Sequence, residues 1–329
     1  MNDNYNLRTK IDKLKKIIYT SFCCKQRAWN KKDKGNWSKL WSAFDNIQDA
    51  QSAIEEYIEQ KYHTKLSIYG ILQALIVQQD SIVHLERAID IKVPKFESFP
   101  ELKKIRNIRN ETIGHPSETK KKRSKDISYK DGNITYTSLS TAENTNILEY
   151  QVWSHNNFVN KKINIIEIIN KQSSVLSIEM DRIIKKLNEI ENKHKEKFKY
   201  DSLVEKLAQS GYLIQKLWSF EDNRHISKTS FETLCKIYED FKKGVKDRYN
   251  IKTLNKHGIA IPGIVEEIKK IDELLKRMEK MVSMDKDVDP FNLDVYVESL
   301  DNSFSELRDM AAEIDIKFQH SNNKKSQTS

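Results

Sequence analysis

The sequence of 329 residues has few of the residues that break or cross-link a backbone: 8 glycines, 5 prolines and 3 cysteines. So few glycines and prolines favour long helices over a many-stranded sandwich or barrel, which needs frequent tight turns. Three cysteines, of which Cys23 and Cys24 are adjacent, cannot form a disulfide framework. We therefore expect buried thiols and a reducing compartment.

Long apolar segments are also missing. The sequence has no run of about 18 apolar residues and no apolar N-terminal segment typical of export signals. We therefore expect a cytoplasmic protein that does not enter a membrane. The net charge is +9, from 57 Lys and Arg against 48 Asp and Glu. Because both signs are abundant and interspersed, this charge permits a polyanionic partner without requiring one.

Apolar residues recur at helical spacing over most of the sequence. Recurrence every three or four residues is typical of helices with one buried face. Ser38 and Pro100 suit the first turns of two of these helices. The spacing predicts helices over residues 5–28, 38–58, 66–91, 100–112, 160–197, 202–219, 229–248, 262–283 and 293–317.

Between the fourth and fifth of these segments the periodicity changes to two. Residues 127–136 alternate apolar and polar side chains around Asp131-Gly132, which predicts a hairpin. Leu148, Tyr150 and Val152 predict a third strand over residues 147–154. We therefore expect a mainly α protein with a small antiparallel β insertion.

The domain organisation follows from these patterns and from the charged stretch near residue 198. We expect an N-terminal helix and polar linker (1–36), a helical domain (37–198) with the β insertion at about 126–154, a second all-α domain (199–320) and a disordered tail (321–329).

Most well-known catalytic motifs are absent. The sequence has no glycine-rich phosphate loop, no HExxH, no GxSxG and no EF-hand loop. No two of its eight histidines lie three or four residues apart, which excludes a pair of metal ligands on one helix turn. We predict no metal and no cofactor. His84 falls on an apolar helical face and is expected to be a core residue.

One segment combines several features of a site. Arg109 and Asn110 end a predicted helix, and His115 follows in "RNETIGHP". Gly114 can adopt the left-handed conformation that ends helices, and Pro116 prevents the helix from continuing. The break would leave His115 free to turn back towards Arg109.

The stretch "RNETIGH" (109–115) resembles the Arg-polar-x(3–5)-His signature of the HEPN superfamily, whose domains are compact helical bundles. Residues 68–91 and 102–116 also resemble an uncharacterised bacterial family that carries this signature, and the similarity covers about residues 37–190. Two departures from the pattern stand out: Pro116 directly follows the histidine, and a β insertion interrupts the bundle soon afterwards. The resemblance implies an HEPN-like bundle in the first domain.

The resemblance also implies a metal-independent endoribonuclease, usually dimeric, in which two motifs face each other. In this chemistry His115 would transfer protons, and the forked guanidinium of Arg109 would bind phosphate oxygens. Asn110 would orient either the phosphate or the imidazole of His115. A homodimer would supply the second histidine. A toxin or antiphage defence effector with a regulatory protein partner is the implied biological role. Residues expected to contact RNA phosphates are Arg106, Lys120, Lys121, Lys122, Arg123 and Lys125.

Simpler interpretations stay open. Gly114, His115 and Pro116 can be an ordinary helix stop, with His115 bonded to a terminal carbonyl and Arg109 paired to Glu111 or another carboxylate. The lysine run can be a solvated loop. The domain can also be a non-catalytic HEPN-like module that binds nucleic acid or protein. A third alternative is a purely structural interaction protein.

Overall fold

A computed structural model describes residues 3–24, 28, 36–92, 99–114, 136–141, 146–154, 157–218, 224–249, 263–283 and 290–319. The chain forms two compact units, unit 1 (Met1–Asn188) and unit 2 (Glu189–Ser329). The division falls inside one long helix, whereas the sequence suggested a boundary at residue 198. The protein is mainly α with a small antiparallel sheet, which confirms the predicted fold class.

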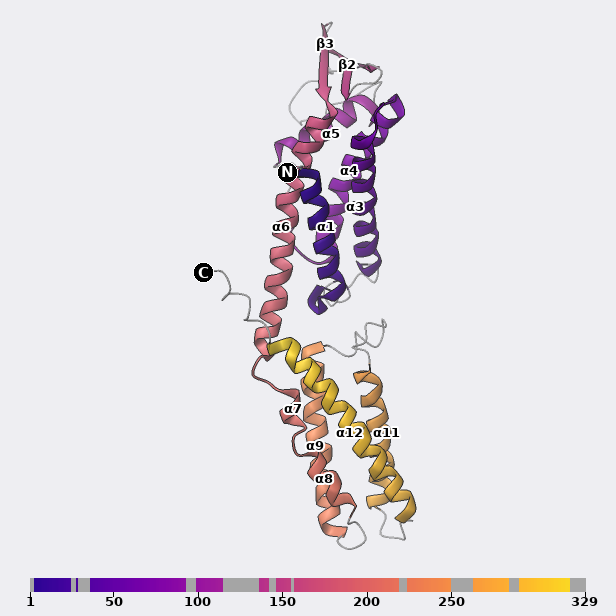
Figure 1. Cartoon of the computed structure of the whole chain (residues 1–329), viewed down its shortest axis with the longest axis vertical. Helices are drawn as coiled ribbons and strands as arrows, with labels where there is room; N and C mark the ends of the chain where they lie inside the picture. The colour runs from indigo at the N-terminus through magenta and orange to yellow at the C-terminus, as the bar shows by residue number, and fades with distance from the viewer. Residues whose placement is uncertain are drawn as a thin grey trace, which may run out of the picture. The chain divides into compact units, whose positions relative to one another are not determined.

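Unit 1 is a bundle of helices that run along one another (Figure 1). Its helices are α1 (Asp3–Thr20), α3 (Asn36–Glu59), α4 (Lys65–Ala88), α5 (Pro100–Arg109) and the first part of α6 (Ile165–Phe198). The predicted start of the second helix at Ser38 is wrong by two residues, because α3 begins at Asn36. Cys23 and Cys24 are buried thiols, as expected.

A three-stranded antiparallel sheet in the order β1-β2-β3 precedes α6 and lies beside α5 at one end of the bundle (Figure 1). Its strands are β1 (Tyr136–Thr141), β2 (Ile147–Ser154) and β3 (Asn157–Asn164). The predicted strand over 147–154 is confirmed, and Leu148 and Tyr150 are buried as its alternation requires. The expected hairpin around Asp131-Gly132 lies outside the described residues, except for Tyr136. Residues 160–164, predicted as helix, belong to β3.

The apolar core of unit 1 consists of two clusters separated by four buried glutamines. Along α3, α4 and α6, apolar residues of one cluster precede the glutamines and those of the other follow them. The glutamine row comprises Gln51, Gln78, Gln79 and Gln172, and each of the four side chains is fully buried. A buried amide is tolerated only when its donors and acceptors are satisfied, so the row demands matched partners.

The row is satisfied by one continuous chain of hydrogen bonds. Arg106 Nε donates to Gln79 (2.8 Å), Gln79 to Gln172 (2.7 Å) and Gln172 to Gln78 (3.0 Å). Gln78 donates to Gln51 over 2.8 Å, and Gln51 donates to the Glu55 carboxylate over 2.9 Å. Every bond points from the cation of Arg106 towards the anion of Glu55. Bonds aligned in this way polarise and strengthen one another.

By length and composition alone, α4 is the one helix in the described part of the chain that could cross a membrane. Its apolar side chains, however, pack within unit 1 and contribute to both apolar clusters. It also carries the buried polar side chains of Gln78, Gln79 and Glu86. These features are typical of the central helix of a soluble domain.

Unit 2 is all-helical in its described residues. It contains the end of α6, α7 (Leu203–Lys206), α8 (Ser210–Leu217), α9 (Arg224–Tyr249), α11 (Ile264–Ser283) and α12 (Pro290–Gln319). The single helix predicted over 202–219 is therefore wrong, because a turn at 207–209 divides it. Asp315 of α12 caps the start of α7. Its carboxylate accepts hydrogen bonds from the backbone N–H groups of Leu203 and Val204, both 3.0 Å long.

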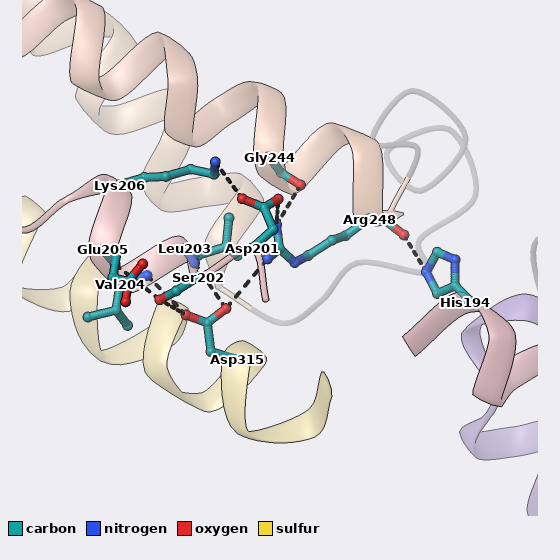
Figure 2. A network of polar contacts seen from close by, with 10 residues as sticks. All are labelled: His194, Asp201, Ser202, Leu203, Val204, Glu205, Lys206, Gly244, Arg248 and Asp315. Carbon is teal, nitrogen blue, oxygen red and sulfur yellow. Dashed lines mark hydrogen bonds and ion pairs between the residues drawn. The ribbon is translucent and has the colours of Figure 1, made fainter. Parts of the chain in front are cut away.

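The interior of unit 2 contains a buried charge, Arg248, whose side chain has no exposed surface. Figure 2 shows its guanidinium between Asp201 at 3.2 Å and Asp315 at 3.7 Å. It lies over the rings of Phe198 and Phe318, with the guanidinium carbon 5.1 Å and 5.6 Å from their centroids. The cluster ties the end of α6, the start of α7, α9 and α12 together.

Candidate functional site

The candidate site lies at the C-terminal end of α5. Pro100 opens this helix, and Leu102, Ile105 and Ile108 face the core. Thr112 continues the buried stripe, and its hydroxyl donates to the carbonyl of Ile108 over 2.7 Å. The apolar stripe predicted from the sequence is confirmed, and it leaves Arg109 and Asn110 on the outer side of the helix.

The end of α5 departs from the expected geometry. Residues Asn110–Gly114 form a π-helical turn, so Gly114 is part of the helix end and not a left-handed residue beyond it. A π turn contains an extra residue and forfeits the usual i to i−4 bonding. Such turns are rare and occur often at functional sites. The motif between Arg109 and His115 therefore coincides with the one π-helical segment in the described residues.

Arg109 is held by neutral oxygens. Its Nη1 donates to Asn110 Oδ1 over 3.2 Å, and its Nη2 donates to Gln73 Oε1 of α4 over 3.1 Å. The Nε atom is buried and has no hydrogen-bond partner among the described residues, and no carboxylate there pairs with the guanidinium. Arg109 is therefore an oriented cation whose charge is not neutralised by a described neighbour.

Arg106, one turn earlier on the same helix, has a different environment. Its Nη2 forms an ion pair with Asp80 at 2.5 Å, and its Nε bonds to the glutamine row. The charge of Arg106 is compensated within unit 1, and both its Nε and its Nη2 atoms are engaged. Arg109, expected to be catalytic, and Arg106, expected to contact RNA phosphates, thus have different environments.

Glu111 does not pair with Arg109. Its Oε2 accepts hydrogen bonds from Lys161 Nζ at 2.7 Å and from the Tyr150 hydroxyl at 2.9 Å. The simpler interpretation, in which Glu111 neutralises Arg109, is therefore wrong for this carboxylate. Burial raises the pKa of Tyr150, and the hydrogen bond to the Glu111 carboxylate raises it further, so the phenol stays protonated as a donor.

Of the predicted site residues, the structure brings together Arg109 and Asn110 and describes Arg106 beside them. His115, Lys120, Lys121, Lys122, Arg123 and Lys125 lie outside the described residues. Gln73, Tyr150 and Lys161 were missed by sequence reasoning. Gln73 is an ordinary polar residue on the exposed side of α4, and nothing in its local sequence marks it as a partner of Arg109.

His84, expected in the core, is exposed and lines a groove of about 540 Å³ between α3 and α4 with Ser42 and Asp80. In the ranges that the structure describes, no group of three or more His, Cys, Asp or Glu side chains could hold a metal ion. Cys235 is half-buried, and its burial and the nearby Glu279 and Glu239 raise its pKa to about 11, which disfavours a reactive thiolate.

Comparison with protein-family models, with curated proteins and with solved structures finds no match to this chain. The function proposed below therefore rests on the residues of the site and on the resemblance of its motif.

Proposed function

We propose that unit 1 is an HEPN-type endoribonuclease that cuts RNA by attack of the 2′-hydroxyl, without a metal ion. The observation that carries the proposal is Arg109: an oriented guanidinium, free of a described carboxylate partner, at the π-helical end of α5. A developing phosphorane has negative oxygens, and a forked cation placed in advance stabilises them. The structure supports the proposal at Arg109 and Asn110. The role of His115 rests on the sequence motif.

In this proposal His115 transfers the proton of the attacking hydroxyl or of the departing 5′-oxygen, since imidazole titrates in the required range. Asn110 fixes the fork of Arg109 through the 3.2 Å contact. Two symmetric copies would provide both an acid and a base, so we propose a homodimer as the active form. The lysine-rich segment would add phosphate contacts that do not read sequence.

The test is cleavage of RNA by the purified protein in the presence of a chelator. We expect products with 2′,3′-cyclic phosphate ends, and we expect Arg109→Ala and His115→Ala each to reduce the cleavage rate at least about 100-fold. Arg109→Lys keeps the charge but loses the fork, so it should recover only part of the rate. Lys103→Ala is the matched control, because Lys103 is an exposed cation on the same helix.

Cleavage that persists in both alanine variants would overturn the site assignment. Salt-sensitive RNA binding without strand scission would instead indicate the non-catalytic HEPN-like module, and binding would then survive His115→Ala. We also propose a cytoplasmic location, from the cysteine usage and the lack of long apolar segments in the sequence. The proposed role as a toxin or defence effector with a regulatory partner follows from the resemblance alone.

A further inference from the structure

Two side chains of the sheet bond to the carboxylate of Glu111 at the candidate site. Glu111 is the second residue of the π turn, and its Oε2 accepts from both Lys161 Nζ (2.7 Å) and the Tyr150 hydroxyl (2.9 Å). Both donors belong to the sheet, Tyr150 to β2 and Lys161 to β3. The three side chains are called here the Glu111 clamp.

The register of the sheet explains why both donors reach the same atom. Tyr150 and Lys161 are direct partners across the β2–β3 pair, so their side chains project from the same face. Lys161 Nζ also lies 5.5 Å from the centroid of the Tyr150 ring, a distance at which a cation is attracted to the ring. Tyr150 is only 2% exposed, so its hydroxyl has little competing water.

The π turn gains from such an external hold. Asn110 N–H still donates to the carbonyl of Arg106, as in an α-helix, but a π turn as a whole uses wider i to i−5 bonds. Side-chain bonds can therefore add to what fixes its direction. Thr112 bonds back to α5 through the carbonyl of Ile108, which fixes one side of the turn. The clamp fixes the other side to the sheet. Between them they determine how the chain passes from Arg109 towards the rest of the motif.

We propose that Lys161, Glu111 and Tyr150 are positioning residues that hold the π turn in the geometry needed for RNA cleavage. This inference rests on the proposed function. It makes the β insertion a working part of the site and not an interruption of it. A misplacement of about 1 Å can cost about 100-fold in rate, so loosening the turn should lower kcat far more than it weakens substrate binding.

The test compares two neighbouring lysines of β3. Lys161→Met removes the clamp charge and keeps the alkyl stem. Lys162→Met is the matched control, because Lys162 projects from the opposite face and forms its own ion pair with Glu149 at 2.9 Å. We expect Lys161→Met to lower kcat at least about 10-fold with less than about a twofold change in KM, and Lys162→Met to change neither.

Two further variants test whether the hydrogen bonds to Glu111 cause the loss of kcat. Tyr150→Phe removes only the hydroxyl and should give a smaller loss of kcat in the same direction. Lys161→Arg restores a donor and should recover part of the rate. If Lys161→Met reduces kcat no more than Lys162→Met does, the clamp has no positioning role.

A second readout does not require activity. Hydrogen exchange of the backbone amides at 110–113 should accelerate at least about 10-fold in Lys161→Met and not in Lys162→Met. If the wild-type protein cuts no RNA, the proposed function fails, while accelerated exchange would still support the clamp. Unchanged exchange together with unchanged kcat would overturn the clamp and leave the proposed function standing.

Discussion

The glutamine row of unit 1 and the Arg248 cluster of unit 2 stabilise buried polar groups in opposite ways. The row consists of four neutral amides that bond to one another, and the charges of Arg106 and Glu55 lie at its ends. A fully buried carboxylate of unit 1, Glu86, is separate from the row and pairs with Arg182. Unit 2 buries a full positive charge, Arg248, and surrounds it with two carboxylates and aromatic rings. The glutamine row requires that each amide donor face an acceptor, whereas the Arg248 cluster requires that the buried positive charge be balanced by carboxylates.

The difference predicts how each unit responds to change. An amide that loses its partner leaves an unsatisfied dipole, which costs about 1–3 kcal/mol. A buried ion pair that loses one partner leaves an uncompensated charge, which costs about 3–5 kcal/mol. The Arg248 cluster should therefore be more sensitive to a single substitution than the glutamine row.

The largest effect is expected for Arg248→Met. It would leave the carboxylate of Asp315, which is 7% exposed, without its cation, and we expect unit 2 to lose about 3–5 kcal/mol of unfolding free energy. Hydrogen exchange, followed separately for peptides from 3–188 and from 189–319, measures this loss. Lys246→Met, an exposed change on the same helix, should cost less than about 0.5 kcal/mol. Equal protection in the two variants would show that the Arg248 cluster does not stabilise unit 2.

A smaller effect is expected for Gln172→Met, which matches the length of the side chain. Gln79 would lose its acceptor and Gln78 its donor, so the unfolding free energy of unit 1 should fall by about 1–3 kcal/mol. The same exchange experiment detects it, with Lys171→Met on the exposed face of α6 as the control. A loss as large as that of Arg248→Met would contradict the contrast between the units.

The smallest effect concerns pH. Burial lowers the pKa of His194 below its ordinary 6.5, and its Nε2 contacts the carbonyl of Arg248 at 2.9 Å. The unfolded state therefore binds a proton before the folded state does, so stability is complete above pH 6.5 and is lost as pH falls through that value. We expect unit 2 to lose at most about 1.4 kcal/mol per pH unit there.

Chemical denaturation at pH 7.5, 6.5 and 5.5 would measure this slope. His194→Gln should flatten it, whereas His225→Gln, an exposed change on α9, should leave it unchanged. A slope that survives in His194→Gln would assign the acid sensitivity to another group.

Sequence periodicity was sufficient to predict most helices and the strand over 147–154, because each has one buried face and a constant spacing. It failed where two periods coincide. Ile163 fits the alternation of Val159, Lys161 and Ile163 as well as the helical spacing of Ile163, Ile166 and Ile169, and only tertiary pairing with β2 decides in favour of the strand.

Other differences have separate causes. A turn at 207–209 divides the helix predicted over 202–219, and Asp315, more than 100 residues away, caps the start of α7. His84 is exposed because it lies on the outer stripe of α4 together with Gln73 and Asp80. Within the candidate site, the sequence identified Arg109 and Asn110, but it could not distinguish the uncompensated Arg109 from Arg106, because the partners Gln73 and Asp80 come from another helix.

The pairing of Tyr150 with Lys161 carries a consequence for how this chain can vary in length. Side chains alternate between the faces of a strand, so removing one residue between Asn157 and Lys161 would turn Lys161 away from Glu111. Removing two residues would again place a side chain on the face of β3 that points towards Glu111. The segment that follows the motif is therefore sensitive to the parity of insertions and deletions, and a related chain with an odd change in β3 should have lost the lysine as well.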